Sequence, residues 1–460
     1  MKKSKTVYIC QSCGHESGKW LGKCPGCGEW NTFAEEIVTP RKKSDKSTKT
    51  SSIPISLANI SGQEYSERVL TGISELDRVL GGGIFPASVT LIAGEPGIGK
   101  STLMLQMSLE LQKKGRNVLY ISGEESPQQI KNRASRLKPA SNDLLVLTET
   151  DVDEIITQLK KLQPAVVIID SIQSIFHSGL SGAPGNVSQV RECAARLFQF
   201  AKENNCSIFL VGHVTKEGSV AGPKILEHLV DVVVYFEGNI QQHRIIRTLK
   251  NRFGAANEIG VFEMLSDGLK EVSDPSQIFL NQREGSTVGS SIACSYEGSR
   301  PFLVEIQALV SRSNYGTPQR TVSGFDYRRL ALILAVLEKH TKQNFGIYEV
   351  FVKIAGGLRI DDPAIDLAVA AALYSSRQDQ LLRNDAVYIG ELGLGGEIRP
   401  VSFIEKRLQE IQKMGFKRVY VSENSFKNTD SPKNISLNIS LLTYISQLLK
   451  PTSSRPSLKG

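Results

Sequence analysis

The eight residues from position 94 to position 101 carry the clearest chemical pattern in the chain. They read GEPGIGKS, a GxxxxGKS motif that follows the apolar stretch SVTLIA. In such a loop the backbone N–H groups surround phosphate oxygens, the lysine reaches the β- and γ-phosphates, and the serine hydroxyl coordinates Mg²⁺. The predicted nucleotide site comprises Gly94, Glu95, Pro96, Gly97, Ile98, Gly99, Lys100, Ser101 and Thr102.

Further polar residues stand at the ends of apolar runs. Asp170 ends AVVIID and is placed to join Ser101 in holding the magnesium ion. Glu124 follows YISG and is the favoured general base for an attacking water, with Glu125 in reserve. His213 ends SIFLVGH, a position from which it could sense the terminal phosphate and signal to the loop TKEGSVAGP. For Asp170 and His213 the alternative is an ordinary residue at a strand end.

Four cysteines form a second chemical pattern near the N-terminus. The segment CQSCGHESGKWLGKCPGC has two CxxC pairs separated by ten residues. Two such turns place four thiolates around one tetrahedral Zn²⁺, and four sulfur ligands leave no position for a substrate water. We therefore predict a structural zinc ribbon whose ligands are Cys10, Cys13, Cys24 and Cys27. The ribbon could simply stabilise its own segment, or it could contact DNA or a partner protein.

The residues around the GxxxxGKS loop alternate between strand-like and helix-like patterns. This alternation predicts an α/β fold with a mostly parallel sheet, in which the loop lies between a strand and a helix. The helix should run to about position 114, with Gly115 able to end it. Strands are expected at 88–94, 116–122, 144–149, 165–170, 207–213, 231–237 and 244–250.

Composition sets wider limits on the protein. A chain of 460 residues predicts two or three domains, and the excess of 55 Lys and Arg over 47 Asp and Glu permits a nucleic-acid partner without establishing one. No apolar window suits a membrane helix or a signal peptide, so a cytoplasmic location without membrane attachment is expected. The segment PRKKSDKSTKTSS at 40–52 is rich in Lys and Ser, which is typical of a flexible linker.

Taken together, the motifs resemble those of one protein family. The entry segment TGISELDRVLGGGIFPASVTLIAGEPGIGKST is similar to that of RecA-like and KaiC-type ATPases. With the four-cysteine ribbon before it and KNRFG at 250–254 after it, the chain closely resembles the bacterial RadA/Sms family of DNA-repair ATPases. The resemblance implies a hexameric ring that hydrolyses ATP, binds single-stranded and branched DNA, drives branch migration and works alongside RecA recombinase.

The same resemblance implies roles for particular residues. Lys250 and Arg252 of KNRFG would reach the nucleotide of a neighbouring subunit and neutralise charge on the transferred phosphoryl group, although KNRFG could also be a plain surface turn. The segment 173–192 is expected to be a long mobile loop that contacts single-stranded DNA, with Arg191 as its one cation. Binding with little sequence preference and strong salt dependence is expected.

The chain after about position 285 resembles the proteolytic domain of Lon. In the segment RIDDPAIDLAVAAAL, Asp362 can cap a helix, and Ala364 is expected in its exposed first turn, where that family has its catalytic Ser. Glu405 in RPVSFIE falls where the catalytic Lys would stand. The Ser–Lys pair is therefore absent, and we expect a scaffold without peptidase activity that helps to hold the ring. Candidate DNA contacts on this scaffold are Arg312, Arg320, Arg328, Arg329, Lys353 and Arg359.

The expected organisation is thus an α/β chain in four parts. A zinc ribbon at 1–35 and a linker at 36–65 precede a RecA-like P-loop ATPase core at 66–275 and a Lon protease-like α+β domain at 285–455. The alternatives to a DNA-dependent motor are an ATP-dependent protease, against which Ala364 and Glu405 argue, and a nucleotide-switched scaffold or autokinase.

Overall fold

The fold is described from a computed structural model of the chain, which divides into a unit of residues 1–272 and a unit of residues 273–460. Within the described residues, no helix is both long and apolar enough to cross a bilayer. Cys13, the loop at 215–223 and nearly all of the predicted linker lie outside those residues. The described residues are 5–10, 14–38, 56, 67–137, 143–180, 182–213, 226–240, 243–280, 287–313, 316–427 and 435–448.

A small antiparallel sheet forms around the N-terminal cysteines. Its strand order is β2-β1-β3, and Cys10 at the end of β1 pairs with Phe33 at the start of β3. The side chains of Cys10, Cys24 and Phe33 form a buried cluster, so this short segment has a core of its own. The strands are β1 (Lys5–Cys10), β2 (Glu16–Ser17) and β3 (Phe33–Val38).

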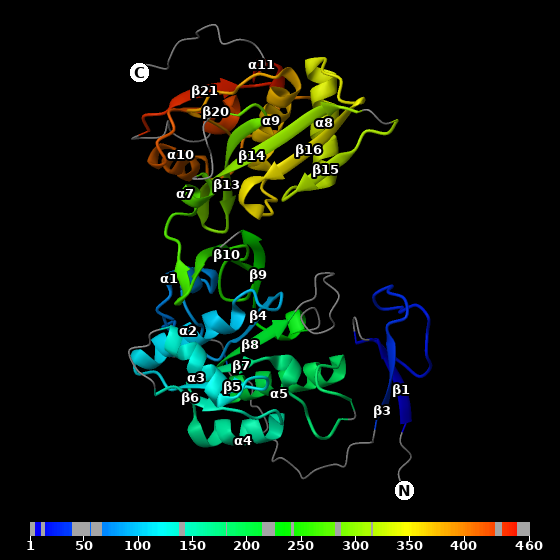
Figure 1. Cartoon of the computed structure of the whole chain (residues 1–460), viewed down its shortest axis with the longest axis vertical. Coiled ribbons are helices and arrows are strands. Elements are labelled where there is room, and N and C mark those ends of the chain that lie inside the picture. The colour runs from blue at the N-terminus through cyan, green and yellow to red at the C-terminus, as the bar shows by residue number, and fades with distance from the viewer. Residues whose placement is uncertain are drawn as a thin grey trace. The chain divides into compact units, whose positions relative to one another are not determined.

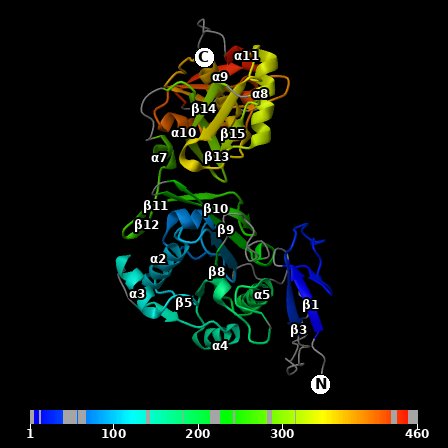
Figure 2. The ribbon, with the colours of Figure 1, turned by 45° about the vertical axis from the view of Figure 1, so that its right-hand side comes forward.

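A nine-stranded sheet organises the rest of the first unit, in the order β12-β11-β10-β9-β4-β8-β7-β5-β6. Figure 1 labels the strands from β10 to β6, and Figure 2 labels β11 and β12. The six strands from β9 to β6 in this order are parallel, and the remaining three are antiparallel. All seven expected strands are present, which confirms the α/β prediction. The strands are β4 (Val89–Gly94), β5 (Val118–Ser122), β6 (Leu145–Leu147), β7 (Val166–Asp170), β8 (Ser207–His213), β9 (Val232–Ile240), β10 (His243–Asn251), β11 (Ile259–Leu265) and β12 (Gly268–Glu271).

Helices cover both faces of this sheet (Figures 1 and 2). One core joins α1, α2 and α3 to one face, and a second core joins α4 and α5 to the other. Because the central strands are buried on both faces, they read as continuous apolar runs such as VVII. The helices are α1 (Ser74–Val79), α2 (Lys100–Lys113), α3 (Pro127–Arg136), α4 (Val152–Leu162) and α5 (Val187–Glu203).

The described residues of the second unit form three smaller sheets packed with helices. A mixed sheet has the order β13-β14-β16-β15, a parallel sheet has the order β17-β20-β21, and β18 pairs with β19. The elements are α7 (Pro275–Leu280), β13 (Ser290–Glu297), β14 (Arg300–Arg312), β15 (Arg320–Ser323), α8 (Tyr327–Thr341), β16 (Tyr348–Ile354), α9 (Asp366–Gln378), β17 (Ala386–Tyr388), β18 (Glu391–Leu392), β19 (Ile398–Arg399), α10 (Ile404–Lys413), β20 (Arg418–Ser422), β21 (Asn438–Leu442) and α11 (Ile445–Leu448).

Candidate nucleotide and metal sites

The GxxxxGKS loop joins β4 to α2, as the sequence predicts. Gly97 and Gly99 have φ angles of 75° and 117°, a left-handed backbone that residues with a Cβ rarely adopt. A Cβ on Gly99 would also lie 2.8 Å from the Cε atom of Met264, so a side chain there would displace the end of that methionine in addition to straining the backbone. The glycines therefore let the loop turn into the first residue of α2, which leaves the amide groups of the helix N-terminus available for an anion.

Lys100 is buried at the base of this loop. Its Nζ atom donates hydrogen bonds to the carbonyl oxygens of Gly94 and Glu95, each at 2.8 Å. Burial lowers the pKa of Lys100 to about 8, although the carboxylates of Asp170, Glu124 and Glu95 act in the opposite direction. The ammonium is thus held among acceptors, and phosphate oxygens are suitable replacements for the two carbonyl groups.

Asp170 lies at the same edge of the sheet, at the end of β7. Its Oδ2 atom accepts a hydrogen bond of 2.5 Å from the hydroxyl of Tyr120, whose side chain is buried on the neighbouring strand β5. Burial, together with the nearby carboxylate of Asp170, raises the pKa of Tyr120, so the phenol keeps its proton and remains a donor. Sequence reasoning did not identify Tyr120; its only signal was a phenol within the apolar strand VLYIS.

Glu124 and Glu125 follow β5, and their surroundings differ. Glu125 forms an ion pair with Arg133 on α3. Glu124 accepts a hydrogen bond from the Ser171 hydroxyl, and its Oε1 atom lies 3.7 Å from Nε2 of His213. His213 and Ser171 hold the pKa of Glu124 below its usual value, against the opposing effect of burial. A carboxylate that stays ionised beside the P-loop suits the orientation of a water molecule, which supports Glu124 over Glu125 as the base.

A cavity of about 270 Å³ adjoins the P-loop and was not predicted from the sequence. The Nε atom of Arg244 donates a hydrogen bond of 3.0 Å to the carbonyl oxygen of Ile98, which ties β10 to the loop. The aromatic rings of Tyr235 and Phe236 on β9 also line the cavity. These groups could contact the base or the ribose of a nucleotide, but their strands carry no motif that marks them.

KNRFG lies at the edge of the sheet that is formed by the amino ends of the parallel strands, opposite to the edge that carries the P-loop. In the antiparallel pair β9–β10, Asn251 is opposite Val232, which is the first residue of β9. Lys250 and Arg252 therefore lie near the amino ends of the parallel strands, whereas the P-loop follows the carboxyl end of β4. At roughly 3.3 Å per residue, the two edges are about 17 Å apart. Within one chain, Lys250 and Arg252 do not meet Lys100, Asp170 and Glu124.

The two cations of KNRFG have different surroundings. The Nζ atom of Lys250 donates to the carbonyl oxygens of Glu227 and Val230, and burial and the neighbouring Arg252 lower its pKa. The side chain of Arg252 is 54% exposed, with Nη1 3.8 Å from Asp231. Arg252 is therefore the more accessible of the two cations.

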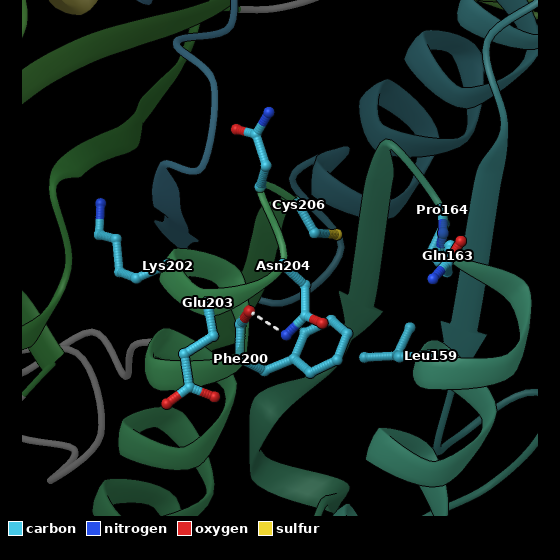
Figure 3. A pocket seen from close by; sticks show the side chains of 9 residues that line it. Leu159, Gln163, Pro164, Phe200, Lys202, Glu203, Asn204 and Cys206 are labelled. Carbon is cyan, nitrogen blue, oxygen red and sulfur yellow. Dashed lines mark hydrogen bonds between the residues drawn. The ribbon is translucent and has the colours of Figure 1, made fainter. Parts of the chain in front are cut away.

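A larger cavity, of about 670 Å³, also lies at this amino edge, because its lining residues Pro164 and Cys206 come just before β7 and β8. Figure 3 shows the side chains that line it. The side chains of Phe200 and Leu159 line this cavity. The Nδ2 atom of Asn204 donates a hydrogen bond of 2.9 Å to the Phe200 carbonyl oxygen. The cavity's single cation, Lys202, is held by Asp231 at 2.8 Å and points away from the other lining side chains. The cavity thus offers no free charge for a phosphate, and we assign it no ligand.

The segment 173–192 is shorter as a loop than predicted. Helix α5 begins at Val187, so the expectation of a loop is wrong for 187–192, and Arg191 is an exposed residue of the first turns of α5. The Gln189 side chain accepts from His177 N and donates to the carbonyl oxygens of Leu180 and Gly182. Because Gln189 is buried and makes these bonds, it anchors the remaining loop to the helix.

The N-terminal cysteines have the geometry of two matching metal-binding turns. Gly14 N donates to Cys10 O and Gly28 N donates to Cys24 O, each at 2.8 Å. The ligand atoms of Cys10, Cys24 and Cys27 all lie within 4.8 Å of one another. Three converging sulfurs in two such turns fit a tetrahedral Zn²⁺ ion, with Cys13, which lies outside the described residues, as the fourth predicted ligand.

The position that Lon-type peptidases fill with Ser is buried here. Asp362 caps the helix entry as predicted, because its Oδ1 atom accepts from Ala364 N at 3.0 Å. The expectation that Ala364 is exposed is wrong: it is fully buried, packed in a cluster with Ile292, Cys294 and Leu303. A hydroxyl at this position would face apolar side chains. Glu405, which stands at the position of the catalytic Lys, is exposed on α10.

Two of the basic residues suggested as DNA contacts are occupied with structural bonds. Arg329 Nε lies 2.6 Å from buried Asp366, and its other nitrogens donate to the carbonyl oxygens of Asp361 and Asp362. Arg320 donates to the carbonyl oxygens of Tyr348 and Phe345. The remaining candidates, Arg312, Arg328, Lys353 and Arg359, are exposed.

Comparison with known proteins identifies the family. The chain is 48% identical over 444 residues to "DNA repair protein RadA" of Bacillus subtilis (strain 168), covering 95% of this chain and 96% of that protein. It is also 46% identical over 458 residues to the protein of the same name from Streptococcus pyogenes serotype M6, covering 99% and 100% of the two chains. The chain belongs to the DNA repair protein RadA family. This confirms the resemblance stated from the motifs.

Three family descriptions match successive parts of this RadA-family chain. Residues 8–35 match a rubredoxin metal binding domain, residues 63–219 match an AAA domain, and residues 315–425 match subunit ChlI of Mg-chelatase. The predicted fold class, with its ribbon, P-loop core and C-terminal domain, is thereby confirmed. The cofactors that follow are ATP and Mg²⁺ at the P-loop and Zn²⁺ at the cysteines.

Proposed function

We propose that this RadA-family protein is a DNA-dependent ATPase motor that assembles as a hexameric ring and drives branch migration of recombination intermediates. In this role it binds single-stranded and branched DNA, works alongside RecA recombinase in the cytoplasm, and takes no part at membranes. The four-part domain organisation and the residue roles predicted from the sequence belong to the same proposal.

The observation that carries the proposal is the placement of the P-loop and KNRFG at opposite edges of one sheet. Head-to-tail contacts close into a ring when the rotation between subunits allows it. Such contacts would place Arg252 of one subunit at the nucleotide of the next. A guanidinium arriving there stabilises the charge on the transferred phosphoryl group and couples hydrolysis to movement between subunits.

Each residue of the P-loop edge has a distinct task in this mechanism. Lys100 binds the β- and γ-phosphates, and Ser101 with Asp170 holds the magnesium ion that neutralises phosphate charge. Tyr120 fixes the orientation of the Asp170 carboxylate through its hydrogen bond. Glu124 orients the attacking water, while His213, 3.7 Å away, is placed to respond when the terminal phosphate leaves.

The C-terminal unit acts in this proposal as a scaffold without peptidase activity. Ala364 has no nucleophilic atom and is buried, and Glu405 is an acid where a Lys would be needed. The alternative of an ATP-dependent protease predicts that casein is degraded in the presence of ATP and spared by Lys100→Ala. Intact casein after prolonged incubation with ATP is the expected result.

The first experiment measures steady-state ATP hydrolysis with and without single-stranded DNA across a salt series. Stimulation by DNA that fades as salt increases is expected, because phosphate contacts release counterions. Lys100→Ala should abolish turnover in every condition. If hydrolysis at low salt is the same with and without DNA, the motor function is contradicted and a nucleotide-switched scaffold or an autokinase is favoured. Retention of γ-³²P on the protein would identify an autokinase.

Mixing two inactive variants tests the shared site directly. Lys100→Ala and Arg252→Ala should each be inactive in turnover, and Arg252→Ala should still bind nucleotide. In rings assembled from a 1:1 mixture of the two variants, about one site in four joins an intact P-loop to an intact Arg252. Hydrolysis should therefore partly return. Arg116→Ala, which removes an exposed arginine near the same edge, is the matched control. No recovery on mixing would refute a site shared between subunits.

A further inference from the structure

An aromatic pair lies on the surface of the C-terminal unit. The rings of Tyr296 on β13 and Phe403 before α10 are stacked, with centroids 4.3 Å apart and planes 16° from parallel. The Phe403 side chain is 55% exposed. Since one face of that ring lies on Tyr296, the opposite face is the part that is open to solvent.

The backbone at Phe403 suggests that this exposure has a purpose. Phe403 is the N-cap residue of α10 and has φ 56° and ψ 35°, in the left-handed region. Ser, Thr, Asp or Asn favour N-cap positions, and bulky side chains rarely adopt positive φ. Phenylalanine thus provides no cap here and is strained as well as exposed. A local structure that is unfavourable in three respects is a reason to look for a function.

A cation lies beside the two rings. The Lys406 Nζ atom is 5.6 Å from the Tyr296 ring centroid and 5.8 Å from that of Phe403, and it donates a 3.0 Å hydrogen bond to the Tyr296 hydroxyl. In the described part of the chain, no carboxylate pairs with Lys406. Its exposed neighbour Glu405 is about 100° away around the helix. The ammonium therefore remains available to an anion next to the rings.

Buried bonds beneath the pair hold it in place. Asp362 Oδ2 accepts a hydrogen bond of 2.8 Å from Tyr296 N and forms a 2.8 Å ion pair with Arg407. Arg407 is 1% exposed and also donates to the carbonyl oxygens of Cys294 and Ser402. Because Asp362 compensates the Arg407 charge, the charge left at the surface of the pair is that of Lys406. The Arg407 guanidinium also lies 5.6 Å from the Tyr296 ring centroid, but it is buried and paired with Asp362. The rings are a preorganised flat platform with one exposed cation, Lys406, at its side.

We propose that Tyr296, Phe403 and Lys406 form a stacking site for an unpaired base of single-stranded DNA. The open face of Phe403 takes the base, and the Lys406 ammonium neutralises an adjacent backbone phosphate. Flat aromatic surfaces combined with a cation are the usual means of holding single strands without sequence preference. This inference rests on the single-stranded DNA binding of the proposed function and adds a location in the C-terminal unit to it.

The decisive variant is Phe403→Asn in the full-length protein. Asn removes the ring, tolerates the left-handed backbone and favours the N-cap position, so the unit should melt at the same temperature or higher. Binding of a fluorescent oligothymidine, followed by anisotropy, should weaken roughly 5- to 100-fold. Phe403→Trp keeps a stacking surface and should bind within about twofold of the unchanged protein.

Lys406→Gln tests the charge separately from the ring. Losing one phosphate contact should reduce the slope of log affinity against log salt by about 0.7, whereas Phe403→Asn should leave this slope unchanged. An oligonucleotide carrying 2-aminopurine should lose fluorescence on binding to the unchanged protein, and less so with Phe403→Asn, since stacking quenches that base.

The outcomes separate the site from the wider function. If the unchanged protein does not bind single-stranded DNA, the proposed function itself fails. If it binds and Phe403→Asn binds equally well, the stacking site alone is refuted. If Phe403→Asn changes only the assembly state in sedimentation, the platform is a contact between protein subunits, which also overturns the inference.

Discussion

The buried ammonium of Lys100 makes nucleotide affinity sensitive to pH. Burial lowers its pKa from 10.5 to about 8 in the chain without nucleotide. Contact with phosphate oxygens favours the charged form, so binding raises the pKa again. A lysine with a depressed pKa in the free protein and a restored one in the complex takes up a proton on binding. The nucleotide affinity is therefore highest when the pH is well below the free-state pKa of about 8, and it falls as the pH rises through that value.

The magnitude follows from the protonated fraction of Lys100. With a pKa of about 8, this fraction falls from about 0.9 at pH 7 to about 0.1 at pH 9, so affinity for Mg²⁺·ATPγS should fall roughly tenfold. With an ordinary pKa of 10.5 the fraction would stay above about 0.95, and affinity would hardly change. The triphosphate itself titrates nearer to pH 6 and contributes little to this window.

Isothermal titration calorimetry in buffers of different ionisation enthalpy measures both the affinity and the number of protons taken up. About 0.9 proton per site is expected at pH 9 and about 0.1 at pH 7. Lys100→Arg provides the matched control, because a guanidinium stays charged and should give affinity independent of pH. Equal affinity of the unchanged protein at both pH values, with no proton uptake, would refute the assignment of a depressed pKa to this lysine.

Three further perturbations have defined outcomes. Tyr120→Phe removes a hydrogen bond to the Asp170 carboxylate that is worth about 1.5–3 kcal/mol, so half-maximal hydrolysis should need roughly 10- to 150-fold more Mg²⁺; an unchanged magnesium titration would exclude this positioning role. Replacing Cys24 and Cys27 by Ser should release Zn²⁺, measured by metal analysis, while Lys100-dependent hydrolysis without DNA persists; full metal retention would disprove the ligand set. Arg407→Met should destabilise the C-terminal unit by about 3–5 kcal/mol, because it leaves a buried carboxylate without its cation. Hydrogen exchange should accelerate in β13 and α10 but not in β4 or β7, and uniform protection throughout would contradict it.

Local patterns were sufficient for the parts of the protein whose chemistry lies within a short segment. The GEPGIGKS loop needs only its own glycines, lysine and serine to form a phosphate site, and its strand–loop–helix context is visible in the neighbouring residues. The two CxxC turns are likewise closed by bonds between near neighbours, such as Gly14 N to Cys10 O. Strands buried on both faces appear as apolar runs, so all seven predicted strands of the ATPase core were found where the sequence indicated.

Where local patterns misled, a contact from elsewhere in the chain was responsible. The loop after β7 ends earlier than expected because α5 begins at Val187, and Gln189 then binds the loop backbone. Ala364 was expected on an exposed turn but is covered by residues of β13 and β14. Arg329 looked like a surface cation, yet the buried carboxylate of Asp366 pairs with it.

The sequence by itself thus determined the family, the cofactors and the presence of a P-loop, because each depends on residue types at fixed short spacings. The tertiary structure decided which distant residues meet. The antiparallel pairing of β10 with β9 placed KNRFG at the edge opposite to the P-loop, and packing brought Tyr120 to Asp170 and Phe403 to Tyr296. The physical reason is that strand pairing and side-chain packing join residues separated by 50 or more positions, as for Tyr120 and Asp170, and leave no periodic signal in the chain.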